Sequence, residues 1–166
     1  MIVRCTRKVL DLLRAAPETW AVDPATTDDW YLNLLWIDRR KCVLLTHAGT
    51  LFSVFRAGVS VSDLRKTGGY VTDVIVEELR AESLPPGLFG QLDPEALRIA
   101  TTASRSTLGF MNDMAVHLRY QAVRAGGLDR CDTKALNRQL RRTLHNHGGY
   151  VTSLDLVAQR RGASTA

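Results

Sequence analysis

The sequence predicts a single α+β domain in which helices pack against a mostly antiparallel sheet. A length of 166 residues suits one domain. Hydrophobic residues at 45% and charged residues at 23% lie near globular averages, so the chain contains enough apolar side chains to form a core. Three consecutive segments with strand patterns are joined by short turns, which predicts an antiparallel meander, and the other segments mostly show helical spacing.

The strands follow from hydrophobic patterning between turn residues. Residues 30–37 are apolar on most positions of both alternating sides, a pattern typical of a strand that is buried on both faces. Asp38-Arg39-Arg40 and Ala48-Gly49 provide the turns that connect this strand to the next two. The five predicted strands are 2–5, 30–37, 41–47, 51–55 and 97–101.

The helices follow from apolar residues at three- and four-residue spacing and from capping residues. Predicted helices cover 6–14, a region from Ser60 to Glu82 that is interrupted at Gly68-Gly69, about 106–124, and about 133–145. The third helix has a core stripe of Leu108, Met111, Ala115, Leu118 and Ala122, and Gly126-Gly127 ends it. We expect the domain to cover residues 1–158 and residues 159–166 to be frayed.

Several classes of protein are disfavoured. Apolar runs are far shorter than the roughly 18 residues of a membrane span, and no secretory signal is visible, so we expect a cytoplasmic protein with no membrane association. The three cysteines are widely spaced, which argues against a disulfide framework or a zinc knuckle. Glycine-rich nucleotide loops, the nucleophile elbow and the zinc-protease motif do not occur. We therefore expect no cofactor.

Basic residues concentrate in the last quarter of the chain. Residues 126–166 hold seven Lys and Arg against three Asp, a local net charge of +4 within a total of +5. On the predicted last helix, Arg138, Arg141, Arg142 and His145 form one stripe opposite Leu136, Leu140 and Leu144, and Lys134 adds a further charge. Such a stripe suits the phosphate backbone of nucleic acid or an acidic protein partner. The alternative interpretation is a solvated helix face.

The long helix carries a second candidate site. Arg105, Asn112 and Arg119 are seven residues apart and share one face, while Asp113 and His117 are spaced for a hydrogen bond. The helix start and Arg105 favour an anion or a substrate. The alternative is again a solvated surface with capping residues.

Two further groups of polar residues are weaker candidates. At the tip between two strands, Arg39 and Arg40 stand beside Lys41 and are able to contact phosphate or an acidic partner. His145 and His147 have metal-ligand spacing, but no further ligands stand at a recognised distance in the sequence, so no metal site is expected.

Four stretches resemble one bacterial family of small proteins that is classed as a domain of unknown function. They are Ile2-Val3-Arg4-Cys5-Thr6-Arg7-Lys8, the run from Asp29 to Cys42 that contains Trp-Ile-Asp-Arg-Arg-Lys-Cys, Ser104 to Asp113, and Leu136 to Thr143. After Thr143 the chain departs from the family pattern, because Leu144-His145-Asn146-His147 replaces a small, proline-containing stretch. The resemblance implies the extent of the domain and the location of a site, but no activity.

Three functions follow from these patterns. The favoured one is a non-catalytic basic module that binds nucleic acid or an acidic protein, within a toxin-antitoxin or defence system. The second is a small metal-independent nuclease or phosphotransfer enzyme that uses Arg105, Arg142 and His145. The third is a structural partner subunit, which would neither bind nucleic acid nor turn over a substrate.

Overall fold

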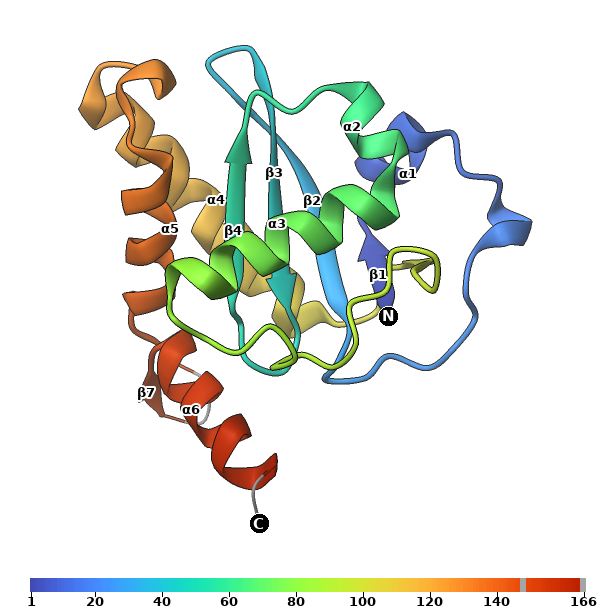
Figure 1. Cartoon of the computed structure of the whole chain (residues 1–166). Coiled ribbons are helices and arrows are strands. Elements are labelled where there is room, and N and C mark those ends of the chain that lie inside the picture. The colour runs from blue at the N-terminus through green and yellow to red at the C-terminus, as the bar shows by residue number, and fades with distance from the viewer. Residues whose placement is uncertain (147–148, 165–166) are drawn as a thin grey trace.

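The fold is built on a five-stranded sheet with the order β4-β3-β2-β1-β5 (Figure 1). The computed structural model describes residues 1–146 and 149–164. The strands are β1 (Ile2–Cys5), β2 (Trp30–Ile37), β3 (Arg40–His47), β4 (Ser53–Ala57) and β5 (Arg98–Thr101). Strands β2, β3 and β4 form the predicted antiparallel meander, and β1 joins β2 and β5 in parallel. The predicted α+β class with a mostly antiparallel sheet is confirmed.

Helices cover both faces of the sheet (Figure 1). The α-helices are α1 (Arg7–Leu13), α2 (Val61–Arg65), α3 (Thr67–Ala81), α4 (Arg105–Ala125), α5 (Thr133–Arg142) and α6 (Ser153–Ser164). The remaining short elements are the 3-10 helices η1 (Pro17–Thr19) and η2 (Leu128–Arg130) and the two-stranded ribbon of β6 (His145–Asn146) and β7 (Tyr150–Val151). Helices α1, α2 and α3 pack on one face, and α4 and α5 pack on the other.

The alternation along β2 divides the core into two clusters. Trp30, Leu32 and Leu34 point to the face under α1 and α3. Tyr31 and Leu35, at alternate positions, point to the face under α4 and α5. All five side chains are buried. The prediction that this strand is covered on both faces is therefore confirmed, and it explains why the strand is apolar on both sides.

Several element boundaries differ from the sequence prediction, and two of the differences have a clear structural cause. Strand β4 starts at Ser53 rather than at 51, because Leu51 has a positive φ of 53° and belongs to the preceding turn. The break between α2 and α3 falls at Lys66 rather than at the two glycines. Gly68 lies inside α3, where a Cβ atom would be 2.3 Å from the carbonyl oxygen of Pro94, so close approach of the 84–97 segment requires glycine there.

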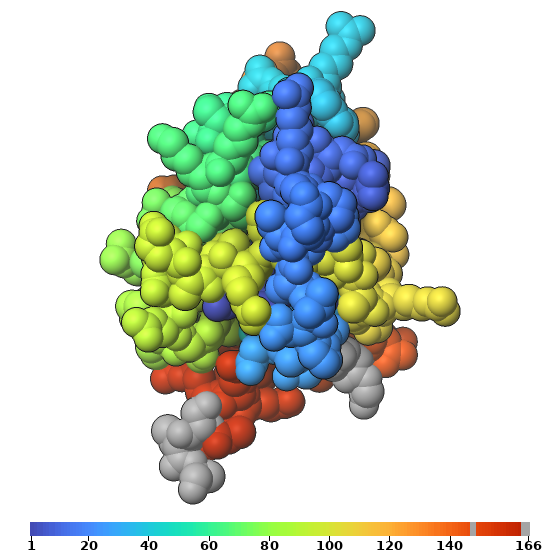
Figure 2. Space-filling view, turned by 90° about the vertical axis from the view of Figure 1, so that its right-hand side faces the viewer, coloured from blue at the N-terminus to red at the C-terminus, as the bar shows by residue number. Residues whose placement is uncertain are grey.

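The C-terminal region differs more. Helix α5 ends at Arg142 because Thr143 adopts an extended backbone, so Leu144 lies outside the helix and is exposed. Helix α6 extends to Ser164, and the last two residues of the predicted frayed end, 159–166, lie outside the described residues. Arg160 of α6 donates to a carboxylate oxygen of Asp28 at 2.7 Å, which fixes this helix against the loop that precedes β2. Figure 2 shows α6 at the opposite end of the molecule from the β2–β3 hairpin tip.

No helix within residues 1–146 and 149–164 is long and apolar enough to cross a membrane.

Candidate functional site

Helix α5 covers the open edge of the sheet. Strand β4 is an edge strand, and the carboxamide of Asn137 pairs with its backbone: the oxygen accepts from the N–H of Phe55 at 2.7 Å and the nitrogen donates to the Phe55 carbonyl at 3.1 Å. The side chain thus replaces a neighbouring strand at that residue. Unpaired edges invite pairing with other chains, so Asn137 protects the sheet.

Arg141 is the second α5 residue that acts on this edge, and it is 0% exposed. Its guanidinium group donates to Glu78 at 2.9 Å, to Glu82 at 2.8 and 2.9 Å, and to the carbonyl of Ser53. The prediction that Arg141 lies on an exposed stripe is wrong. The cause is α3, which brings two glutamates to the same side of α5 as the leucines, so that a buried arginine is fully paired there.

Arg142 is exposed, but its charge is paired. It donates to the Glu82 carboxylate at 2.7 and 3.0 Å. Burial alone would raise the pKa of Glu82, but hydrogen bonds from Arg142 and Arg141 outweigh that effect and hold the pKa below its usual value. The Glu82 carboxylate is therefore ionised at neutral pH and neutralises much of the charge that the predicted stripe required.

The predicted basic stripe is therefore reduced to two residues on α5. Lys134 and Arg138 are exposed, and neither forms an ion pair with any residue in the described part of the chain. His145 is not on the helix but on β6. Lys134 and Arg138 stay candidates for binding, whereas a continuous line of cationic groups does not exist on α5.

The outer face of α4 holds the second predicted group. Arg105, Asn112 and Arg119 are all exposed, and within residues 1–146 and 149–164 neither arginine has an ion-pair partner. Ser104 caps this helix by accepting from the N–H of Thr107 at 3.2 Å. The described contacts of His117 include Gln121, at 3.4 Å, and none joins it to Asp113.

Sequence analysis missed the apolar part of the same face. Val116, Tyr120 and Val123 are 64%, 58% and 76% exposed and stand at i, i+4 and i+7. We call these three residues with Arg119 and Arg124 the α4 surface. Arg124 lies over the Tyr120 ring at 5.8 Å from its centroid. The i, i+4 and i+7 spacing of these residues is present in the sequence, but spacing alone does not show that this side of the helix is exposed.

The β2–β3 hairpin tip is held by η2, which follows α4 in the chain. Asp38 accepts from the N–H of Leu128 at 2.6 Å, and Arg40 pairs with Asp129 of η2. Asp38 and Arg39 both have positive φ, as a two-residue hairpin turn requires. Of the two predicted arginines at this tip, Arg40 is paired, whereas Arg39 is exposed and forms no ion pair with the described residues.

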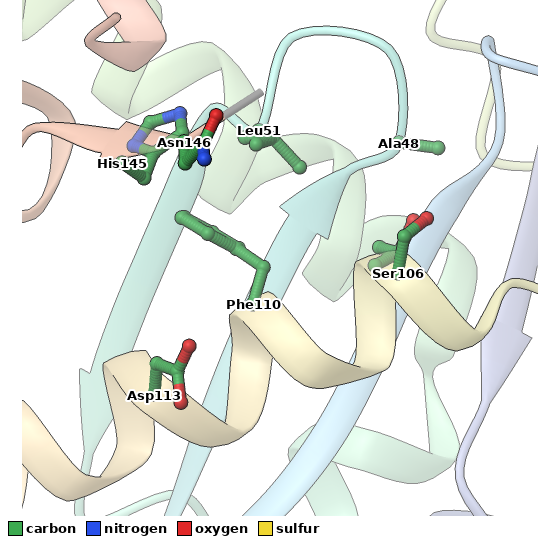
Figure 3. Close-up of a pocket in the computed structure, with 8 residues that line it drawn as sticks. Ala48, Leu51, Ser106, Phe110, Asp113, His145 and Asn146 are labelled. Carbon is green, nitrogen blue, oxygen red and sulfur yellow. The ribbon is translucent and has the colours of Figure 1, made fainter. Parts of the chain in front are cut away.

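A pocket of about 250 Å³ lies between α4, the β3–β4 turn and β6 (Figure 3). Its lining residues are Ala48, Leu51, Ser106, Thr107, Phe110, Asp113, His145 and Asn146. The His145 ring meets the Phe110 ring edge-on at 5.0 Å, and its Nδ1 lies 3.1 Å from the carbonyl oxygen of Thr143. Among the three residues of the predicted nuclease site, only His145 lines this pocket.

The histidine spacing noted in the sequence raises the question of metal ligands. Residues 1–146 and 149–164 contain no group of three or more His, Cys, Asp and Glu placed to hold a metal ion. His147, the second histidine of the spacing noted in the sequence, lies outside the described residues.

A family model matches residues 2–156, which is nearly the whole chain. The chain belongs to the family described as domain of unknown function DUF6933. The DUF6933 match ends inside α6, so it includes the α4 surface, the α5 contacts with the sheet edge and the pocket. A search of curated proteins gives no match to this DUF6933 chain.

Proposed function

We propose that this protein is a non-catalytic binding module whose outer α4 surface holds an acidic, amphipathic helix of a partner protein. One observation carries the proposal: Val116, Tyr120 and Val123 are large apolar side chains on one exposed stripe, with Arg119 and Arg124 beside them. Grouped exposed apolar residues with aromatic and arginine neighbours are typical of protein interfaces. A helix in such a contact supplies apolar residues at the same spacing.

Charge decides which partner fits. Helix α4 contains Arg105, Arg119 and Arg124 but only one acidic residue, Asp113. Two copies of this surface would bring like charges together in a symmetric contact, which costs free energy. A partner segment with Asp or Glu flanking its apolar residues would pair with the arginines instead. This argument favours a different, acidic protein over a second copy of the chain.

Nucleic acid is the less favoured partner. Backbone binding requires several cationic groups in line, and burial of Arg141 with pairing of Arg142 interrupts that line on α5. The apolar side chains of α4 would gain nothing from phosphate. A protein partner also suits the proposed place in a toxin-antitoxin or defence system, in which one small protein acts by holding another.

Site-specific photo-crosslinking in cells tests the proposal. A photo-reactive amino acid is placed at Val116 or Val123, and at Val22 as a control, because Val22 is 97% exposed and lies far along the chain from α4. We expect a protein adduct from the two α4 positions only, with the crosslinked partner segment rich in Asp and Glu by mass spectrometry. The adduct survives nuclease treatment and is lost when Arg119 and Arg124 are both changed to Glu.

Other outcomes contradict the proposal. A nucleic acid adduct, or one that depends on Lys134 and Arg138 but not on Arg119 and Arg124, would favour nucleic acid. A crosslinked homodimer would favour a second copy. Equal adducts at Val22 and Val123 would show that the α4 surface has no particular partner.

A further inference from the structure

The pocket beside α4 presents a row of three side chains that differ in chemistry. Ser106, Phe110 and Asp113 stand at i, i+4 and i+7, so one side of the helix gives a hydroxyl, an aromatic ring and a carboxylate in line. Figure 3 shows Phe110 reaching toward Leu51 and His145, with Ser106 and Asp113 on either side of it. Asn146 faces this row from β6.

These side chains select among ligands by charge. No Lys or Arg lines the pocket in the described part of the chain, and the Nδ1 atom of the one lining histidine, His145, faces the Thr143 carbonyl. The Asp113 carboxylate therefore disfavours an anion there. Asp113 is also exposed, and a single exposed carboxylate attracts a cation only weakly. A carboxylate, a carboxamide and a hydroxyl together accept and donate hydrogen bonds to ligand hydroxyl groups. Phe110 adds an apolar surface.

Tyr150 is a second aromatic residue next to Asn146, although it is not one of the lining residues of the pocket. It is the cross-strand partner of Asn146 in the β6–β7 ribbon, and such partners have Cβ atoms about 4.5–5.5 Å apart on the same side. Tyr150 is 82% exposed. Its ring is amphipathic, with an apolar face and a polar hydroxyl, and therefore suits a ligand that has both apolar and polar surfaces.

We infer that this pocket binds a small, uncharged, polyhydroxylated ring of the monosaccharide class. Asp113 and Asn146 bind its hydroxyl groups, and the Phe110 and Tyr150 rings contact its C–H surface. The volume of about 250 Å³ lies below the range of about 300–1,000 Å³ that is usual for sites of drug-sized ligands, which limits the ligand to about one ring. An adjoining cavity of about 300 Å³ shares Ala48, Ser106 and Thr107 and leaves space for a substituent.

Titration of ¹⁵N-labelled protein, followed by NMR, tests the inference. The probes are D-ribose, D-glucose and N-acetyl-D-glucosamine, with inorganic phosphate and ethylamine as anion and cation controls. We expect at least one sugar to shift the amide signals of residues 106–113, 145–146 and 150–151, and neither control to do so. Asp113→Ala weakens sugar binding about tenfold or more, since hydrogen bonds to a charged group are lost. Tyr150→Ala weakens it about two- to tenfold.

Matched variants distinguish a site from a general effect on the protein. Asp73→Ala removes an exposed acidic residue of α3, and Trp36→Ala removes an exposed aromatic ring of β2. Both leave sugar binding unchanged. Absence of shifts with all three sugars, stronger shifts with phosphate or ethylamine, or equal binding by the wild type and Asp113→Ala overturns the inference.

Discussion

Arg141 has protein groups in place of water on every side. Two glutamates and a backbone carbonyl accept its hydrogen bonds, and the Phe52 ring lies 4.9 Å from its guanidinium carbon. Removal of the Arg141 charge leaves the buried carboxylates of Glu78 and Glu82 without the ion pairs that offset their burial. We expect Arg141→Ala to lower the free energy of unfolding by about 3–5 kcal/mol in urea denaturation.

Arg138 is the matched control for this substitution. It lies one turn earlier on α5 and is exposed, so Arg138→Ala changes the free energy of unfolding by no more than about 0.5 kcal/mol. Similar losses for the two variants would show that the α3–α5 ion pairs do not stabilise the fold.

His47 makes stability depend on pH. It packs between Trp30 and Phe89, and burial, reinforced by the charge of Arg160, lowers its pKa from 6.5 to about 3. The unfolded chain takes up a proton on this residue below pH 6.5 while the native protein does not, so stability falls as the pH decreases from 6.5 toward 3. The loss between pH 6.5 and 5 is about 2 kcal/mol, measurable by urea denaturation at each pH.

Two histidine variants separate this effect from general acid sensitivity. His47→Gln removes the titrating group and flattens the pH dependence in that window. His117→Gln, on the half-buried side of α4, leaves it in place. Identical profiles for the wild type and His47→Gln would assign the pH dependence to other groups.

Single residues were the hardest feature to predict from the sequence. The core-facing stripe of α4 was predicted, because spacing along one helix determines it, whereas the exposed apolar residues of the same helix were missed. The burial of Arg141 was not, because it depends on Glu78 and Glu82, which are about 60 positions away in the chain. Local spacing therefore placed this arginine correctly on α5 but could not show what lies opposite it.

Among the elements, α4 combines a buried stripe with an exposed apolar stripe. Leu118 is buried in the cluster beneath α4 and α5, and its truncation leaves a cavity. We expect Leu118→Ala to cost about 2–5 kcal/mol, measured as a shift of the urea midpoint. Val123→Ala removes a similar side chain from the exposed side of the same helix and leaves the midpoint nearly unchanged. A large effect of Val123→Ala on the monomer would place that residue in the core.

Strand patterns predicted the strands of the sheet well, whereas the predicted ends of several elements were displaced by one or more residues. β1 and β2 have the predicted bounds because turn and capping residues flank them. The end of α5 was placed too late because Leu144 continues the leucine spacing of Leu136 and Leu140, although the backbone leaves the helix at Thr143. Hydrophobic periodicity shows which residues share a helix face, but it does not show at which residue the backbone leaves the helix.

At the scale of the whole molecule, the two core clusters share one sheet. Trp30 belongs to one cluster and Met111 to the other, and the alternating side chains of β2 join them. We expect both clusters to unfold together. Tryptophan fluorescence and the Met111 methyl NMR signal should give one urea midpoint, and two separated midpoints would show that the faces unfold independently.

The contact between α5 and the sheet edge also has a consequence during protein synthesis. The backbone of Phe55 has no hydrogen-bond partner from α5 until Asn137 has been synthesised, 82 positions later in the chain. At a translation rate of about 5–20 residues per second, that interval is roughly 4–16 s. The nascent β4 edge is unprotected throughout it, and unprotected edges template aggregation. A slow stretch of codons between these two residues would lengthen the exposure, so the yield of folded protein should depend on where ribosomes pause.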